Sequence, residues 1–195
     1  NKIIDKLNET DKELLNKSTN TIIKQVDALK LMVNEFAEYS RTPSLVRKII
    51  NITELIDEIS YLYSDQRIEI QKIYPNKIKE LKIDENKFRQ VLINIFDNSK
   101  AATENTKHPK IVITVKYNKN FIMLKFEDNG IGIPKEIMEK IYEPYVTSKK
   151  TGTGLGLAIV NKIIEEHSGN IEINNIQPNG VCILITLPLT ETKNG

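Results

Sequence analysis

Two glycine-rich segments near the C-terminus hold the residues best suited to chemistry. One, 128–134, begins with Asp128, and the other, 147–156, carries Lys149 ahead of three glycines. Glycine lets backbone N–H groups approach an anion, because no side chain intervenes. The apolar run 155–164 follows at once and predicts a helix whose N-terminus points at that anion. Together the two segments predict a site for a base and its phosphates.

The spacing does not fit other common nucleotide motifs. No glycine is followed by lysine and then a hydroxyl residue, as a P-loop requires. The dinucleotide fingerprint requires a glycine where Leu157 stands, and the His-Arg-Asp tripeptide of protein kinases does not occur. Flexible loops use the same residues, so either glycine segment alone would be a weak indication.

A third segment, 87–102, has the pattern of an amphipathic helix. Its apolar stripe consists of Phe88, Val91, Leu92, Ile95 and Phe96. Asn94 and Asn98 are four residues apart, so they share one helix face. A side-chain amide oxygen suits Mg²⁺, a hard ion that bridges nucleotide phosphates. Either asparagine alone would more often be a solvated residue or a cap, but the pair ahead of the glycine turns favours a metal–nucleotide site.

In order and spacing, these segments resemble the N, G1, F and G2 boxes of the sensor histidine kinases, over roughly 51–188. The ATP-binding domain of that family has the Bergerat fold, shared with gyrase, certain chaperones and mismatch-repair ATPases. Residues 18–43 are similar to the second dimerisation helix of nitrogen-regulation sensor kinases of the NtrY type.

The resemblance implies ATP and Mg²⁺ as ligands and a role for each matching residue. Asn98 would ligate Mg²⁺, and Asn94 would line the phosphate end of the pocket. Asp128 would accept a hydrogen bond from the adenine amino group, and Lys149 would neutralise phosphate charge. The turn beneath the purine and the lid over the triphosphate would be formed by Gly130, Gly132, Gly152, Thr153, Gly154, Leu155 and Gly156. The plainer alternatives are a turn-forming aspartate and a surface lysine.

The resemblance also separates kinases from ATPases. Hydrolysing members of the superfamily place a glutamate four residues before the metal-binding asparagine, where Asn94 stands here. An amide cannot act as a base. Asp97 lies about 100° around the helix from Asn98, so we expect it to face elsewhere. We therefore predict slow ATP hydrolysis and transfer of the phosphate to a protein side chain.

The phosphoacceptor histidine of the family is not matched. The chain has two histidines. His108 precedes a proline in a predicted loop, and His167 ends the helix 155–164 and reads as a C-terminal cap. We expect the acceptor helix to precede Asn1 in the intact protein. The last box also departs from the family, because Gly180 is followed by Val181 where threonine is usual. No hydroxyl contact to adenine is expected from that strand.

The N-terminal region carries a heptad seam at spacings of 4, 3, 4 and 3, formed by Ile22, Val26, Leu29, Val33 and Phe36. A helix over about 11–41 is predicted, ended by Pro43. We expect residues 1–43 to be the remnant of a dimerisation and phosphotransfer hairpin that pairs with a second subunit in a homodimer. The alternative is a helix packed on its own domain.

Residues 44–190 are predicted to form a two-layer α/β sandwich with a mixed sheet and helices on one face, followed by a tail, 191–195. Residues 43–50 read as a hinge-like link, and helix 52–62 follows with Thr53 as its cap. The predicted strands are 68–73, 111–117, 121–126, 171–173 and 181–187.

The charge balance, 28 Lys+Arg against 26 Asp+Glu, does not favour a nucleic-acid partner. No apolar run approaches the ~18 residues of a membrane span, and the single Cys182 reads as a small buried hydrophobe. We expect a cytoplasmic domain without membrane contact, from a protein anchored in the bacterial inner membrane by a segment elsewhere.

The resemblance implies a kinase that phosphorylates a histidine for relay to an aspartate on a response-regulator receiver domain. A non-catalytic, nucleotide-responsive module for dimerisation or regulator binding remains an alternative. A serine kinase of the anti-sigma type is a weaker alternative, because the heptad helix disfavours it.

Overall fold

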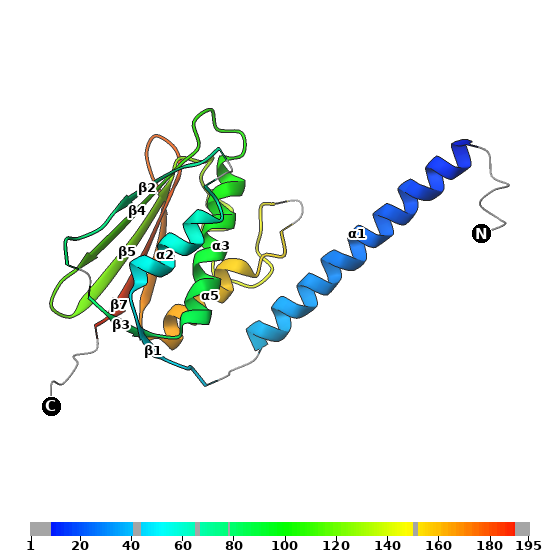
Figure 1. Ribbon diagram of the computed structural model, residues 1–195. Coiled ribbons are helices and arrows are strands. Elements are labelled where there is room, and N and C mark those ends of the chain that lie inside the picture. The colour runs from blue at the N-terminus through cyan, green and yellow to red at the C-terminus, as the bar shows by residue number, and fades with distance from the viewer. Residues whose placement is uncertain (1–8, 41–43, 65–66, 78, 150–151, 190–195) are drawn as a thin grey trace. The chain divides into compact units, whose positions relative to one another are not determined.

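The computed structural model describes residues 9–40, 44–64, 67–77, 79–149 and 152–189. The chain divides into two compact units, residues 1–42 and 43–195, which are described separately (Figure 1). Among the described residues, no helix combines the length and the apolar character needed to cross a bilayer.

The described residues of the first unit form the helix α1, Glu9–Ser40, where the sequence predicts a helix over about 11–41. All five seam residues, from Ile22 to Phe36, are exposed on it, with 49 to 64% of their surface accessible. Apolar side chains in such number at heptad spacing are more typical of a helix that pairs than of one that faces water.

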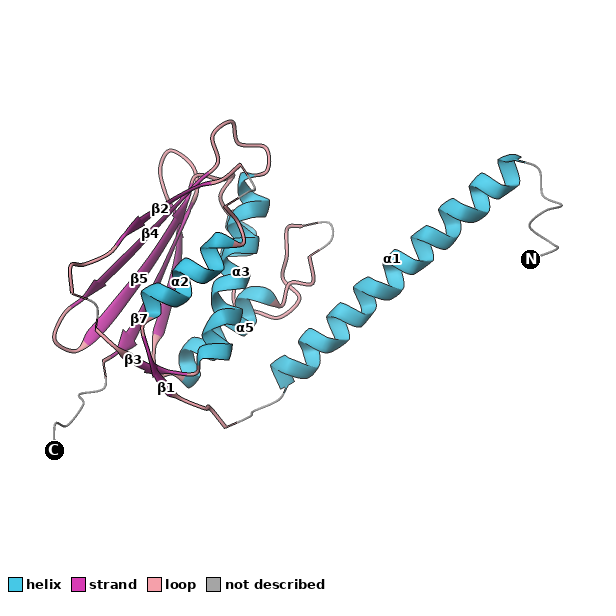
Figure 2. Cartoon of the chain, in the orientation of Figure 1, coloured by secondary structure: helices cyan, strands magenta, loops and turns pink. Residues whose placement is uncertain are grey.

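The second unit is built on a five-stranded sheet with the order β2-β4-β5-β7-β6. Its strands are β2 (Glu69–Ile73), β4 (Lys110–Tyr117), β5 (Phe121–Asp128), β6 (Asn170–Asn175) and β7 (Val181–Pro188). β2 runs parallel to β4 and the other neighbours are antiparallel, so the sheet is mixed. The helices α2 (Ile52–Tyr61), α3 (Glu85–Thr103) and α5 (Gly156–Glu166) cover one face (Figures 1 and 2). The predicted two-layer α/β arrangement is confirmed.

The alternation of β5 explains how a carboxylate comes to lie beneath the helices. Successive side chains of a strand point to opposite faces of the sheet. In β5 the buried positions are Ile122, Leu124, Phe126 and Asp128. Asp128 therefore ends an otherwise apolar row that packs against α3, rather than standing in an exposed turn.

His167 links the start of α3 to the end of α5. It is the C-cap residue of α5, as expected, and it is 4% exposed. Its Nδ1 lies 2.7 Å from Ile163 O and its Nε2 accepts a hydrogen bond from Asp84 N at 3.0 Å. Its ring also packs edge-on against Phe88. Asp84 in turn is the N-cap of α3, so one histidine fixes the start of α3 to the end of α5.

The start of the second unit, predicted as a hinge-like link over 43–50, contains structure that the sequence did not predict. β1 (Lys48–Ile50) pairs antiparallel with β3 (Leu81–Ile83) in a separate two-stranded sheet. Val46 N donates to Asp84 Oδ2 at 2.9 Å, and the guanidinium of Arg47 donates to Glu166 O at 2.8 Å. The segment after Ser44 is therefore bonded to the ends of α3 and α5 rather than being a free hinge. A further short helix, α4 (Lys135–Met138), was also not predicted.

Candidate functional site

The carboxylate of Asp128 lies at the base of the candidate site, with only 6% of the residue exposed. Its Oδ1 accepts a hydrogen bond from Gly130 N at 2.9 Å, and its Oδ2 accepts one from Ser99 Oγ at 3.2 Å. Burial raises the pKa of Asp128, while hydrogen bonds from Gly130, Ser99 and the backbone of Val181 act to lower that pKa. Asp128 is thus a buried acceptor whose bonded neighbours favour its ionised form.

The loop after Asp128 packs directly on α3. Ile131 N donates to Ala102 O at 3.1 Å, and a Cβ atom at Gly130 would come within 2.7 Å of that oxygen. A side chain at position 130 would therefore push the loop off the helix. Asn175 of β6 holds the other end of the loop, since its side chain exchanges two 2.8 Å hydrogen bonds with the backbone of Ile133. Gly132, with φ +77°, makes the turn between these contacts.

Lys149 joins Asn98 of α3 to the glycine-rich segment 147–156, called the lid segment below. Lys149 Nζ donates to Asn98 Oδ1 at 2.6 Å. Although Lys149 is an exposed residue, desolvation lowers the pKa of its ammonium group, and the nearby carboxylate of Asp97 opposes that change. An amide oxygen that bonds an ammonium group is also a hard oxygen donor of the kind Mg²⁺ prefers. The residues present therefore fit a magnesium ion held by one amide together with phosphate oxygens and water.

Asn94 lies under the N-terminus of α5, one helical turn before Asn98. Its Nδ2 donates to Gln90 O at 3.0 Å. A Cβ atom at Gly156 would lie 2.9 Å from Asn94 Oδ1, so glycine is what lets α5 begin this close to α3. The unpaired N–H groups at the start of α5 make that end of the site attractive to an anion.

Gly154 of the lid segment packs against the backbone of Tyr145, nine residues earlier in the chain. Tyr145 N donates to Gly154 O at 3.0 Å, and a Cβ atom at Gly154 would come 2.5 Å from the Tyr145 backbone. Both residues have positive φ, +70° for Gly154 and +68° for Tyr145. The Thr153 side chain accepts a hydrogen bond from Leu155 N at 3.4 Å, and Leu155 is fully buried. Gly152 N lies 3.4 Å from Lys149 O, while residues 150–151 lie outside the described residues.

The predicted site residues therefore gather along one face of α3, with the buried acid at one end and the lysine and the start of α5 at the other. Residues 83–191, more than half of the chain, match the family described as "Histidine kinase-, DNA gyrase B-, and HSP90-like ATPase". The chain belongs to this ATPase family.

Its relatives within the family include sensor histidine kinases. The nitrogen regulation protein NtrY of Azorhizobium caulinodans is 33% identical over 186 residues, which is 91% of this chain and 24% of that protein. The sensor histidine kinase ZraS of Escherichia coli O157:H7 is 29% identical over 174 residues, 87% of this chain and 38% of that protein. The chain thus spans about a quarter of the length of NtrY.

Solved structures agree on the fold. The catalytic domain of the histidine kinase ThkA matches with a TM-score of 0.66 and 34% identity, over 73% of this chain and 97% of that one. A structure of ThkA in complex with the response regulator protein TrrA matches with a TM-score of 0.76 and 31% identity, over 96% and 55% of the two chains.

Within this ATPase fold, the structure adds site residues that the sequence did not reveal. Ser99 bonds the buried acid, and Asn175 anchors the glycine loop. The side chain of Asn129 points to the start of β4 and not to the site. It accepts a hydrogen bond from Lys110 N and donates one to His108 O, both at 2.8 Å. Asp97 accepts a hydrogen bond from Tyr63 OH at 2.8 Å, on the flank of α3 that faces the end of α2.

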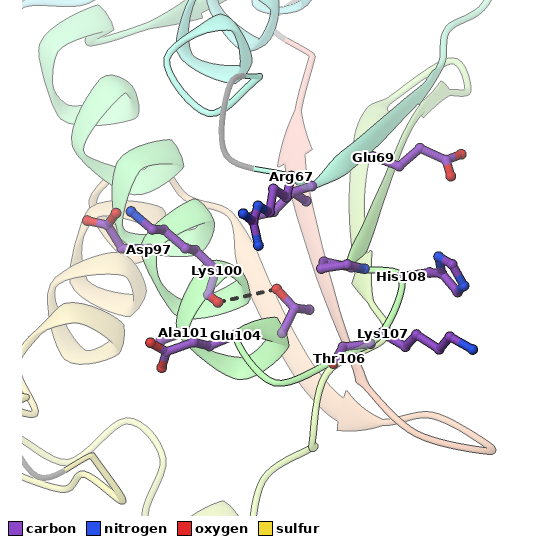
Figure 3. A pocket seen from close by; sticks show the side chains of 12 residues that line it. Arg67, Glu69, Asp97, Lys100, Ala101, Glu104, Thr106, Lys107 and His108 are labelled. Carbon is purple, nitrogen blue, oxygen red and sulfur yellow. Dashed lines mark hydrogen bonds between the residues drawn. The ribbon is translucent and has the colours of Figure 1, made fainter.

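A cavity of about 660 Å³ is lined by residues of α3, of the start of β2 and of the loop before β4 (Figure 3). Its lining includes Arg67, Asp97, Lys100 and Glu104, but neither Asn98 nor Asp128. The lining holds as many basic side chains (Arg67, Lys100 and Lys107) as acidic ones (Glu69, Asp97 and Glu104), so its charge favours neither an anion nor a cation. The face of α3 with Asn94 and Asn98 is the better candidate for a nucleotide site, because donor and acceptor groups gather there.

Proposed function

We propose that this chain is the ATP-binding catalytic region of a sensor histidine kinase, which transfers the γ-phosphoryl group of ATP to a histidine outside this sequence. The observation that carries the proposal is the alignment of a buried acceptor, an amide oxygen already bonded to a cation, and a helix N-terminus along one face of α3. An adenine base, a divalent cation and a phosphate chain need these three groups in this order.

Each residue has a defined task in that mechanism. Asp128 accepts the hydrogen bond from the adenine amino group, and Gly130 lets the loop lie flat on α3 beneath the base. Bound Mg²⁺ supplies charge neutralisation across the phosphates, which is a large part of phosphoryl-transfer catalysis. Asn98 contributes the protein oxygen to that ion, and Lys149 contributes a second positive charge. Asn94 keeps the start of α5 directed at the phosphates.

The two histidines of the chain are poor acceptors for the phosphoryl group, which supports an acceptor elsewhere. His167 is buried, with both ring nitrogens in hydrogen-bonding contact with the backbone. His108 is exposed in the loop before β4, and Asn129 bonds its backbone oxygen. Neither lies among the residues proposed to bind the phosphates. Asn94 also offers no base to activate water, so the proposal includes slow hydrolysis.

The proposed partners are a second copy of the chain and a response-regulator receiver domain. The exposed seam of α1 supports pairing between copies, and the likeness to ThkA, which is known in complex with a response regulator, supports the second partner. A membrane anchor elsewhere in the intact protein remains part of this proposal.

Calorimetry with Mg²⁺ and a non-hydrolysable ATP analogue tests the binding step. We expect binding by the native chain and at least a tenfold loss of affinity in Asp128→Asn, which corresponds to ~1.4 kcal/mol. No binding, or no difference between the two proteins, would remove the basis of the proposal. Labelled ATP and a separately purified acceptor-helix protein then test transfer. Binding without transfer would favour the non-catalytic module, and hydrolysis at several turnovers per second would contradict the assignment of Asn94.

A further inference from the structure

Ser99 and Asp128 face each other across the boundary between α3 and β5. Both are buried, with 3% of Ser99 and 6% of Asp128 exposed. Ser99 Oγ lies 3.2 Å from Asp128 Oδ2, while Oδ1 is bonded to Gly130 N at 2.9 Å. Each oxygen of the carboxylate therefore has a donor from a different element, which fixes the plane of the group.

Neighbouring residues do not duplicate the Ser99 hydroxyl. Val181, which pairs with Asp128 across β5 and β7, offers the carboxylate only its backbone N–H. Thr103, one turn further along α3, donates instead to Ser99 O at 2.8 Å. In the part of the chain that the structure describes, the side-chain hydrogen bond to Asp128 comes from Ser99.

This contact bears on which base the site accepts. An ionised carboxylate only accepts hydrogen bonds, whereas a protonated one also donates. Adenine presents an amino donor at its six-position, and bases such as guanine present an oxygen acceptor there. An ionised Asp128 attracts the amino group of adenine and repels the oxygen of an oxo-purine. A protonated Asp128 can form a hydrogen bond with either group. A donor fixed on Asp128 Oδ2 favours the ionised form in a site where burial opposes it.

We propose that Ser99 is a positioning residue that sets the base selectivity of this site. Its hydroxyl orients the Asp128 carboxylate and keeps it an acceptor, so that the site takes an amino-purine nucleotide over an oxo-purine one. The inference rests on the proposed function, because it needs Asp128 to meet the base. Ser99 acts through Asp128 and touches neither the phosphates nor the metal ion.

The test compares Ser99→Ala with the native chain in two measurements. The first is the carbon NMR titration of the Asp128 carboxyl without nucleotide, where we expect a higher pKa in the variant. The second is the affinity for a non-hydrolysable ATP analogue and for its inosine counterpart, measured at a series of pH values from neutral into the acidic range, because burial raises the pKa of Asp128. We expect Ser99→Ala to weaken ATP binding about tenfold, since a hydrogen bond to a charged group is lost. Inosine binding should weaken less, so the selectivity ratio falls, most strongly between the native pKa of Asp128 and the higher pKa expected in the variant.

Ser60→Ala is the matched control. Ser60 is also a helix serine with 3% of its surface exposed, but its hydroxyl donates to Asp57 O in α2. We expect the control to leave both the titration and the selectivity ratio unchanged. An equal loss for both nucleotides, or the same Asp128 titration in Ser99→Ala and the native chain, would overturn the proposal. If the native chain binds neither nucleotide, the proposed function fails, while the titration still decides whether Ser99 controls Asp128.

Discussion

Lys149 Nζ and Asn98 Oδ1 lie 2.6 Å apart although 51 positions separate them in the sequence. The contact joins the lid segment to α3 at the oxygen that we propose for Mg²⁺. Asn98 would offer this oxygen to a bound Mg²⁺, and the ammonium group of Lys149, released from that oxygen, would then be available to a phosphate oxygen. Metal binding and lysine–phosphate contact are therefore expected to occur together.

Replacing Lys149 by methionine tests this role. Methionine keeps the length and apolar character of the stem but removes the charge. We expect affinity for a non-hydrolysable ATP analogue to fall about tenfold or more, because a charged hydrogen bond to phosphate is lost. Affinity for adenosine, which has no phosphate, should change little. Lys140→Met, at another exposed lysine of the same loop region, is the control and should affect neither ligand. Equal losses for ATP and adenosine would contradict the assignment.

The raised pKa of Asp128 predicts a pH dependence of nucleotide binding. An ionised Asp128 can accept the hydrogen bond from the adenine amino group on either carboxylate oxygen, whereas a protonated Asp128 carries a hydrogen on one of them. As the pH falls through the native pKa of Asp128, affinity should therefore fall, and this loss should begin at a higher pH than an exposed aspartate would give. Binding measured across acidic pH values checks this. In Asp128→Asn binding should be weak at every pH, and a matching acid loss in that variant would assign the titration to another group.

The parts of the site that lie in elements with a regular pattern of apolar residues could be predicted from the sequence. The stripe from Phe88 to Phe96 places Asn94 and Asn98 together on another face of α3. The predicted strand 121–126 stopped short of Asp128, which the structure places at the inward-facing end of β5. Ser99 could not be found this way, because its partner is 29 positions away and meets it only through the packing of α3 on the sheet. The three-residue strands β1 and β3 are too short to show a period.

Local signals also failed where two residues of similar chemistry compete. Thr53 was expected to cap α2, but the cap is Asn51, whose side-chain oxygen accepts hydrogen bonds from Thr53 N at 3.1 Å and Thr53 Oγ1 at 2.8 Å. Asparagine and threonine are both good N-cap residues. Which of them takes the position depends on where the preceding strand β1 ends, and that is set by its pairing with β3.

His167 predicts a second pH effect, on stability. Burial lowers the pKa of His167, whereas the unfolded chain keeps the ordinary value of about 6.5. Above that value both states are neutral and the His167 contacts contribute fully. As the pH falls below it, the unfolded state binds a proton first, so this contribution is lost towards the lowered native pKa. Urea unfolding at neutral and acidic pH should show a larger acid loss for the native chain than for His167→Ala.

At neutral pH, His167→Ala should itself cost about 2–4 kcal/mol, because it leaves Asp84 N without its partner and a cavity beside Phe88. His108→Ala is the control, since His108 is exposed and should change neither stability nor its pH dependence by a measurable amount. If the two variants behave alike, the bridge between α3 and α5 does not contribute to stability.

The exposed seam of α1 predicts association between copies of the chain. The paired variant Ile22→Asp, Val33→Asp places two charges on that seam, where burial against a partner helix would leave them unpaired. Equilibrium sedimentation should show association in the native chain and a monomer in the variant. The variant Lys17→Asp, Lys24→Asp introduces the same side chains on the outer face of the helix and should sediment like the native chain. Identical masses for the native chain and the seam variant would indicate that α1 does not pair through these residues.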